Sequence, residues 1–416
     1  MVRDTFIRVL KRRDFSRLWI AQLLSQIAAN MLTFALVLHI YDLTKSLTTI
    51  SLVIIATSIP SVIFGPFSGV LTDRVRYKKI LIYTNFLRFL VALVLIPATN
   101  NTLAILELLF LMATITQFFA PAEMSSIPLV VKKEQMVTAN SIYITVLYGS
   151  LILGYGIAGP LLALIGAKLF FLIVAALYLV AMFFVNNMSE YDQKEVHGHL
   201  TISNLAKNVS LVWHETKDGL RYVLKDKSVF SPLLKLTIGW AMFGAFIVMI
   251  PGFAENVIGI SAKLSGVILI APAGVGMVIA SYLLNKYKSW DKFQTITVGF
   301  IICGSALFTL AIYNFYKFFH YAIFIAIILM VILGMSASFI YISSQTLLQL
   351  NSVGKLRGRV FGIAAMTINL AMGVPALFVG GIADLTSTVF TLILLALIVI
   401  IYGASSFYEE SYLGVD

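Results

Sequence analysis

The chain has 416 residues, of which 60% are hydrophobic and 12% are charged, and its mean hydropathy is +0.95. Soluble globular domains are closer to half apolar and a quarter charged, so this composition excludes a soluble enzyme, a disordered chain and a collagen-like repeat. The net charge of +11 would suggest a nucleic-acid partner in a soluble protein, but in an integral membrane protein it indicates cytoplasmic loops rich in Lys and Arg.

Twelve apolar runs are long enough to cross a bilayer, at about 20 residues per crossing. They fall at about 15–40, 47–71, 80–98, 103–130, 138–166, 169–188, 232–257, 264–285, 293–312, 320–349, 360–383 and 388–408. The shortest separation is the predicted turn formed by Gly166, Ala167 and Lys168. The first run is too long for a signal peptide and lacks a cleavage site of small residues, so it is interpreted as a spanning helix. The expected fold class is an all-α integral membrane protein with twelve transmembrane helices in two pseudo-symmetric six-helix bundles.

Basic residues are distributed unevenly between the loops of the two sides. If the N-terminus is inside, 25 of the 30 Lys and Arg residues fall in cytoplasmic segments, four fall in outer loops and one, Arg88, falls inside a predicted helix. The positive-inside rule then predicts a multi-pass protein of the cell (cytoplasmic) membrane with both termini in the cytoplasm. On this partition Arg88 is the only intramembrane base.

The interval 189–231 is the one long polar stretch, and it separates a predicted N-terminal bundle, 1–188, from a C-terminal bundle, 232–416. Apolar and basic residues in its second part both recur at helical spacing: Leu220, Val223 and Leu224, with Lys217, Arg221 and Lys225. We interpret this part of the cytoplasmic linker as an amphipathic helix, which either lies on the inner leaflet or is a solvated connector.

A faint internal repeat relates the two predicted bundles. Asp73 and Asp291 lie in equivalent loops, and the same offset takes Ser126 to Ser344. Six helices followed by six related helices is a recurrent plan of secondary transporters, in which the two bundles rock about a site between them.

The sequence GVLTDRVRYKKI at 69–80 carries the marks of a known loop. Gly69, the pair Asp73 and Arg74, and the basic cluster that includes Lys78 resemble the loop signature of the major facilitator superfamily. Gly69 permits close helix packing, and Asp73 can cap the following helix or pair with a basic neighbour.

Three further segments resemble the drug–proton antiporter branch of this superfamily, which contains macrolide and siderophore exporters. They are FFAPAEMSSIPLVVKKEQMVTANS at 118–141, ETKDGLRYVLKDKSVFSPLL at 215–234 and LRGRVFG at 356–362. The resemblance implies the major facilitator fold and a transporter, not an enzyme, that exports a small organic substrate in exchange for protons by alternating access. We expect a monomer without a cofactor.

Two opposite charges lie inside predicted helices. Arg88 is about eight residues from the inner end of the third helix and Glu123 about seven residues from that of the fourth, so both are expected ~10–12 Å below the inner surface. Intramembrane charges are expensive and are candidates for function. We expect direct or water-mediated contact, with Asn85 helping to satisfy the guanidinium. The pair is either a coupling and gating switch or a fixed ion pair, unless Glu123 pairs with the loop around Arg74.

Polar residues also form a stripe on the first predicted helix, at Gln22, Gln26 and Asn30. A stripe of this kind does not face lipid, so it lines either a substrate cavity or a contact between helices. Further candidates for the cavity wall are Thr114, Gln117, Tyr148, Trp240 and Gln345.

No phosphate-binding loop of the G-x-x-x-x-G-K-[ST] type and no H-E-x-x-H motif is present, so a gradient must drive uphill transport, and no metal site is expected. An apolar, aromatic cavity with few fixed charges suits a neutral or cationic amphipathic molecule, such as a drug or a secreted metabolite. The alternatives are an importer of a nutrient or siderophore and, from another class, a membrane enzyme or scaffold. The expected partners are the small organic substrate, protons and the lipid bilayer, and not nucleic acid.

Overall fold

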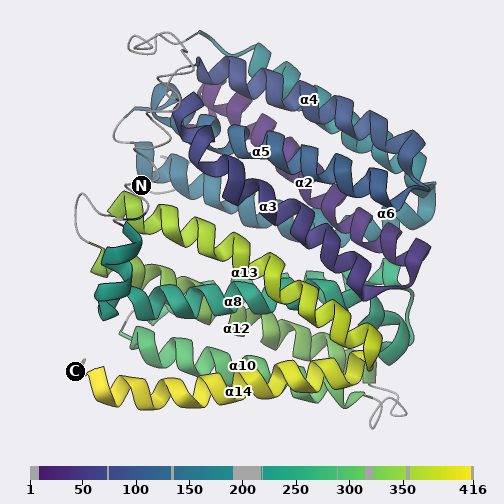
Figure 1. The fold of residues 1–416 in the computed structure, drawn as a ribbon. Helices are drawn as coiled ribbons and strands as arrows, with labels where there is room; N and C mark the ends of the chain where they lie inside the picture. Colours follow the sequence, from purple (N-terminus) through teal and green to yellow (C-terminus); the bar gives the residue numbers. More distant parts are fainter. Residues whose placement is uncertain are drawn as a thin grey trace. The chain divides into compact units, whose positions relative to one another are not determined.

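The structure is a computed structural model, and it describes residues 9–72, 75–132, 135–190, 217, 219–287, 289–313, 322–352 and 357–413. All regular elements in these ranges are helices (Figure 1). Those of the first half are α2 (Arg13–Thr44), α3 (Leu47–Thr72), α4 (Tyr77–Ala98), α5 (Thr102–Val130) and α6 (Met136–Asn186).

Helix α6 contains two membrane crossings. Its 51 residues are interrupted at Gly166, which has φ 74° and ψ 167°. An unbroken helix of that length would extend about 75 Å, more than twice the ~30 Å hydrocarbon core of a bilayer. Glycine adopts a positive φ without the steric penalty that a Cβ brings, and the predicted turn at this position is confirmed.

The helices of the second half begin with α8 (Lys227–Phe253). They continue with η2 (Ala254–Ile258), η3 (Ala262–Leu264), η4 (Gly266–Ile270), α9 (Ala271–Lys286), α10 (Lys292–Ala311), α12 (Ala322–Asn351), α13 (Arg357–Leu385) and α14 (Thr388–Leu413). In the described part of the chain, eleven helices are long and apolar enough to cross a membrane. Because α6 crosses twice, the predicted all-α fold with twelve crossings is confirmed.

The chain divides into two compact units. Unit 1 comprises Met1–His39 and Ala56–Val212, and unit 2 comprises Ile40–Ile55 and Trp213–Asp416. The segment 40–55, which ends α2 and begins α3, therefore belongs to unit 2 by its contacts, although it lies in the first half of the sequence. Most of the predicted linker, 191–216, lies outside the described residues. Its predicted amphipathic helix is described only at 217 and 219–225, which are helical.

Unit 1 packs around α4, which contacts α5 and α6. Its buried face follows the helical repeat and includes both apolar and polar side chains, among them Leu81, Asn85, Arg88 and Ala92. This placement brings the two predicted polar residues of α4 to the interior of the unit.

Unit 2 is held together by close helix contacts, with α9 against α12, α10 against α12 and α14, and α8 against α13. Two glycines permit the first of these. A Cβ on Gly276 would lie 1.9 Å from the carbonyl oxygen of Val331, and a Cβ on Gly334 would lie 1.8 Å from that of Ala273. Small residues at such positions allow the backbones of membrane helices to approach each other.

Candidate functional site

A buried polar cluster occupies the interior of unit 1. We call it the unit 1 cluster and define it by Ser25 of α2, Asn85 and Arg88 of α4, Glu123 of α5 and Tyr143 of α6. The side chains of Arg88 and Glu123 are almost completely buried, with exposed fractions of 2% and 1%. Asn85 and Arg88 are three residues apart, so the helical repeat places both on the buried face of α4. The expectation that both charges face the bundle interior is confirmed.

Arg88 is held mainly by aromatic rings. Its guanidinium carbon lies 4.1 Å from the ring centroid of Phe119 and 5.7 Å from that of Tyr178. Two of its nitrogens, Nε and Nη2, are buried and make no hydrogen bond. Stacking on an aromatic face stabilises a desolvated guanidinium, but it leaves the directional N–H donors available.

Among the described residues, the polar partner of Glu123 is the phenol of Tyr143. Both carboxyl oxygens are buried, and neither makes a hydrogen bond of normal geometry. The described residues include no basic group within 4.0 Å of this carboxyl, so the direct form of the expected contact with Arg88 is absent in this conformation and the fixed ion pair is not formed. The phenol of Tyr143 lies close enough to interact electrostatically with Glu123. Arg74, the other basic partner considered, lies outside the described residues.

The expected contact of Asn85 with the guanidinium is wrong. The Asn85 oxygen accepts a hydrogen bond from Ser25 at 2.8 Å, and its amide nitrogen donates to the carbonyl of Leu81 at 2.9 Å. Both polar atoms of the side chain are therefore engaged one turn away from Arg88. The Ser25 bond ties α2 to α4 beside the charged pair.

The polar stripe of the first helix makes contacts between helices. Gln22 is buried and donates to the carbonyl of Tyr143 at 3.4 Å, and Asn30 donates to the hydroxyl of Ser150 at 3.4 Å. Gln26 is partly buried between them. Within unit 1 the stripe thus follows the second of the two interpretations, a polar seam between α2 and α6.

The other predicted site residues of unit 1 that the structure describes make hydrogen bonds to backbone carbonyls. Thr114 and Gln117 are partly buried and donate to carbonyls of their own helix. Lys78 donates to the carbonyl of Met188 at 2.7 Å. Asp73 and Arg74, and the side-chain surroundings of Gly69 and Tyr148, lie outside the described part of the structure.

In unit 2 the predicted Trp240 lies in an aromatic cluster. Its ring packs edge-to-face against Phe243 at 5.5 Å and against Tyr341 of α12 at 5.9 Å. Gln345, one turn beyond Tyr341 on α12, is partly buried. Aromatic side chains from two helices and a nearby amide therefore occur in one region of this unit.

Lys235 corrects the assignment of basic residues. It lies inside α8 with an exposed fraction of 2%, and its Nζ is 4.9 Å from the ring centroid of Phe293. The positive-inside partition placed Lys235 among the cytoplasmic residues, so the prediction that Arg88 is the only intramembrane base is wrong. The signal was present in the sequence, because Lys235 falls within the apolar run predicted at 232–257.

A second polar cluster lies in unit 2, where the connection between α2 and α3 meets the end of α13. The carboxylate of Asp384 accepts hydrogen bonds from the hydroxyl of Ser46 at 2.6 Å and from the backbone N–H of Leu47 at 2.9 Å. It also accepts two from Thr48, from the N–H at 2.9 Å and from the hydroxyl at 2.7 Å. Asp384 therefore caps the first turn of α3, a position that favours a negative charge.

Ion pairs surround this cap. Lys45 lies 3.2 Å from Glu255 and 3.7 Å from Asp42, and Lys263 lies 3.0 Å from Asp42. Partial burial alone would lower the pKa of Lys45, but the hydrogen bond to Glu255 and the two negative charges outweigh it, so the pKa is raised. Lys45 also has φ 51°, in the left-handed region that is unfavourable for a residue with a Cβ. The ion pairs stabilise that conformation.

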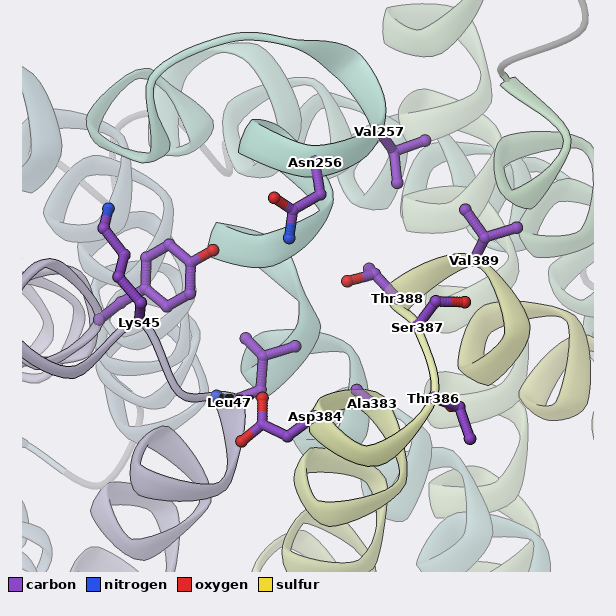
Figure 2. Close-up of a pocket in the computed structure, with 11 residues that line it drawn as sticks. Lys45, Leu47, Asn256, Val257, Ala383, Asp384, Thr386, Ser387, Thr388 and Val389 are labelled. Atoms are coloured by element: carbon purple, nitrogen blue, oxygen red, sulfur yellow. Dashed lines mark hydrogen bonds between the residues drawn. The ribbon is translucent and has the colours of Figure 1, made fainter.

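A cavity of about 360 Å³ lies at this place. Figure 2 shows side chains from the α2–α3 connection, η2 and the α13–α14 turn around it. Its wall is mixed, with polar groups such as Asn256, Asp384 and Thr388 beside the apolar Leu47 and Val257. This region could not be predicted from the sequence because its partners are far apart in the chain; Lys45 and Glu255, for example, are 210 residues apart.

The chain is similar in sequence to a family of membrane transporters and to individual members of the efflux type. The sequence model described as Major Facilitator Superfamily matches residues 18–376. The chain is 23% identical over 336 residues to BacE of Bacillus subtilis (strain 168), a proposed bacilysin exporter, covering 79% of this chain and 78% of that protein. It is 23% identical over 390 residues to macrolide efflux protein A of Streptococcus pyogenes, covering 89% of each.

Solved structures agree on the fold. The nucleoside transporter NupG matches with a TM-score of 0.73 and 12% identity, over 95% of this chain and 100% of that one. The POT family transporter PepTSo matches with a TM-score of 0.73 and 13% identity, over 97% of this chain and 99% of that one. At these identities the likeness concerns the fold alone.

Proposed function

Since this chain belongs to the major facilitator superfamily, we propose that it is a proton-coupled exporter of small amphipathic organic molecules that works by alternating access in the cell membrane. Its relatives are transporters of the efflux type, and it is a transporter and not an enzyme. The direction of transport, the substrate class and the coupling ion are the proposed parts.

The buried carboxyl of Glu123 is the observation that carries the coupling. A buried carboxylate that has the phenol of Tyr143 beside it, but no counter-ion within 4.0 Å among the described residues, is strongly disfavoured, and binding a proton removes its charge. We infer that Glu123 takes up and releases the transported proton. In the protonated state the carboxyl is neutral and Arg88 remains stacked on Phe119.

Arg88 supplies the opposing charge. When Glu123 loses its proton, its negative charge attracts the guanidinium, whose Nε and Nη2 are available to donate. The two helices α4 and α5 are packed against each other, so a closer approach of these side chains changes the contact between the helices. Asn85 and Ser25, which are hydrogen-bonded to each other, position α2 beside this switch.

The aromatic cluster around Trp240 suits the apolar part of a substrate, and Gln345 offers a neutral hydrogen-bonding group nearby. The polar residues Gln26, Thr114, Gln117 and Tyr148 are proposed as the corresponding wall in the first half, beside the seam that Gln22 and Asn30 form between α2 and α6. The relatives' names, which concern bacilysin and macrolides, favour substrates of the antibiotic type. The buried Lys235 removes the argument against anionic molecules that rested on Arg88 alone.

Flux measurements in proteoliposomes test this function. The purified chain is reconstituted, a panel of labelled macrolides, peptide antibiotics and cationic dyes is added, and uptake is followed with an imposed pH gradient, with and without an uncoupler. An antiporter accumulates a substrate against its gradient only while the pH gradient lasts. Accumulation that is indifferent to the uncoupler would refute proton coupling. Lower cellular uptake of the substrate in a deletion strain, instead of higher accumulation, would identify an importer.

A further inference from the structure

The short helix that precedes α8 has an orientation that a membrane surface would require. Residues 219–225 are helical, and Asp226, with φ −97° and ψ 99°, is extended and separates them from α8. In Figure 1 this short teal helix runs across the end of α8 and does not continue its axis. Because α8 is a membrane-spanning segment that begins at Lys227, a helix that crosses its end lies along the plane of the bilayer surface.

The inner face of the short helix is fixed by packing. Val223 has an exposed fraction of 1% and belongs to a core cluster with Val229 and Leu233 of α8, and Tyr222 packs against the same cluster. Gly219, one turn earlier, is buried as well. Asp226 accepts hydrogen bonds from the N–H and hydroxyl of Ser228, so this acidic group is engaged in capping α8. The rotation of the helix about its own axis is therefore determined.

The opposite face is exposed and divided into two edges. Leu220 and Leu224 have exposed fractions of 44% and 60%, and the basic Lys217, Arg221 and Lys225 are exposed too. At 3.6 residues per turn, the two leucines and then the three basic residues follow one another in steps of about 20–40° around the helix. The apolar edge is thus adjacent to the basic edge, and together they span the side away from Val223.

We propose that this surface, defined by Lys217, Leu220, Arg221, Leu224 and Lys225 and called the connector face, binds the headgroups of anionic phospholipids in the inner leaflet. The leucines reach the acyl region at the level where α8 leaves the bilayer, and the basic side chains meet the phosphates above it. A basic edge beside an apolar edge is complementary to an anionic bilayer surface. The inference depends on a cytoplasmic position for this segment and not on the direction of transport or on the coupling ion.

Native mass spectrometry of the full chain tests the headgroup contact. The protein is released from mixed micelles that contain phosphatidylglycerol or phosphatidylcholine, and the retained lipid is counted. The triple variant K217Q/R221Q/K225Q is expected to retain phosphatidylglycerol at least tenfold less, since each basic side chain near an anionic surface changes the affinity about fivefold. The control K11Q/R13Q/K286Q removes the same charge elsewhere and should retain the lipid. Equal loss in both variants, or no preference for phosphatidylglycerol in the unaltered chain, would overturn the proposal.

Spin labelling tests the position of the face. Cys303 is the chain's one cysteine and is buried, so Cys303→Ala provides a background for a single label. A label at Leu224→Cys in phosphatidylglycerol vesicles is expected to collide more with oxygen than with a water-soluble nickel complex, and a label at Glu190→Cys is expected to do the reverse. A Leu224 label with the accessibility of a water-exposed site would refute the membrane contact even if transport proved proton-coupled.

Discussion

The substitution Glu123→Gln is the most direct test of the coupling mechanism. It keeps the size and the hydrogen-bonding capacity of the side chain but removes the ability to exchange a proton. Among the described residues Glu123 forms no ion pair, and a glutamine can keep the contact with the phenol of Tyr143, so the fold is expected to persist, with an unfolding temperature close to that of the unaltered chain. The variant should lose only the ability to use the proton gradient to accumulate substrate.

The expected size of the effect follows from one buried acid. If one proton is exchanged per substrate, a pH difference of one unit supplies about 1.36 kcal/mol, which supports a substrate gradient of about tenfold. In proteoliposomes with that pH difference, the unaltered chain should therefore approach tenfold accumulation. The Glu123→Gln variant should equilibrate the substrate to a ratio of about one while still exchanging labelled for unlabelled substrate.

A matched control is available on the same helix. Glu107 of α5 is exposed, so Glu107→Gln removes the same charge without touching the unit 1 cluster and should leave accumulation unchanged. If Glu123→Gln retained tenfold accumulation, Glu123 would not carry the proton. If it lost both accumulation and exchange together with a lower unfolding temperature, the residue would be structural.

Three further outcomes follow from unit 2. Gly334→Ala places a Cβ 1.8 Å from the carbonyl oxygen of Ala273. This clash should destabilise the α9–α12 contact by about 1–3 kcal/mol in thermal unfolding. The control Gly381→Ala, whose Cβ would meet nothing within 4 Å, should leave the stability unchanged. Asp384→Ala removes the cap of α3 and should lower stability by about 2 kcal/mol in the same assay; an unchanged unfolding temperature would contradict the role of the cap. The pKa of Lys45 is raised in the folded state, so its stabilising contribution is present below pH 10.5 and is lost as the pH rises through the folded-state pKa. Between pH 9 and 12 the unfolding temperature should therefore fall in a way that the Lys45→Met variant does not show.

The fold class and the number of crossings could be predicted from the sequence because a bilayer imposes a simple rule. Each crossing needs about 20 apolar residues, and the backbone must satisfy its hydrogen bonds within each segment. Hence the runs and the turn at Gly166 agree with the structure. The burial of Arg88 and Glu123 could be predicted for the same reason, since a charge inside an apolar run must face protein.

The partners of these side chains could not be predicted in the same way. Helical spacing places Asn85 one turn from Arg88. It does not reveal that the hydroxyl of Ser25, on another helix, donates a hydrogen bond to the side-chain oxygen of Asn85. Likewise, the positive-inside partition counted Lys235 with the cytoplasmic linker, while the packing of α8 buries it beside Phe293. Rotation of each helix about its axis decides such contacts, and that rotation results from packing against neighbours.

The amino-acid sequence by itself thus determined that the chain crosses the membrane twelve times and that Arg88 and Glu123 lie within apolar segments, because the transfer energy of each segment depends on its own composition. Only the tertiary structure decided that Arg88 and Glu123 form no ion pair with each other, that residues 40–55 belong with the second half, and that Asp384 caps a helix more than 330 residues earlier. Those features depend on side chains from distant segments meeting in space, which no local pattern encodes.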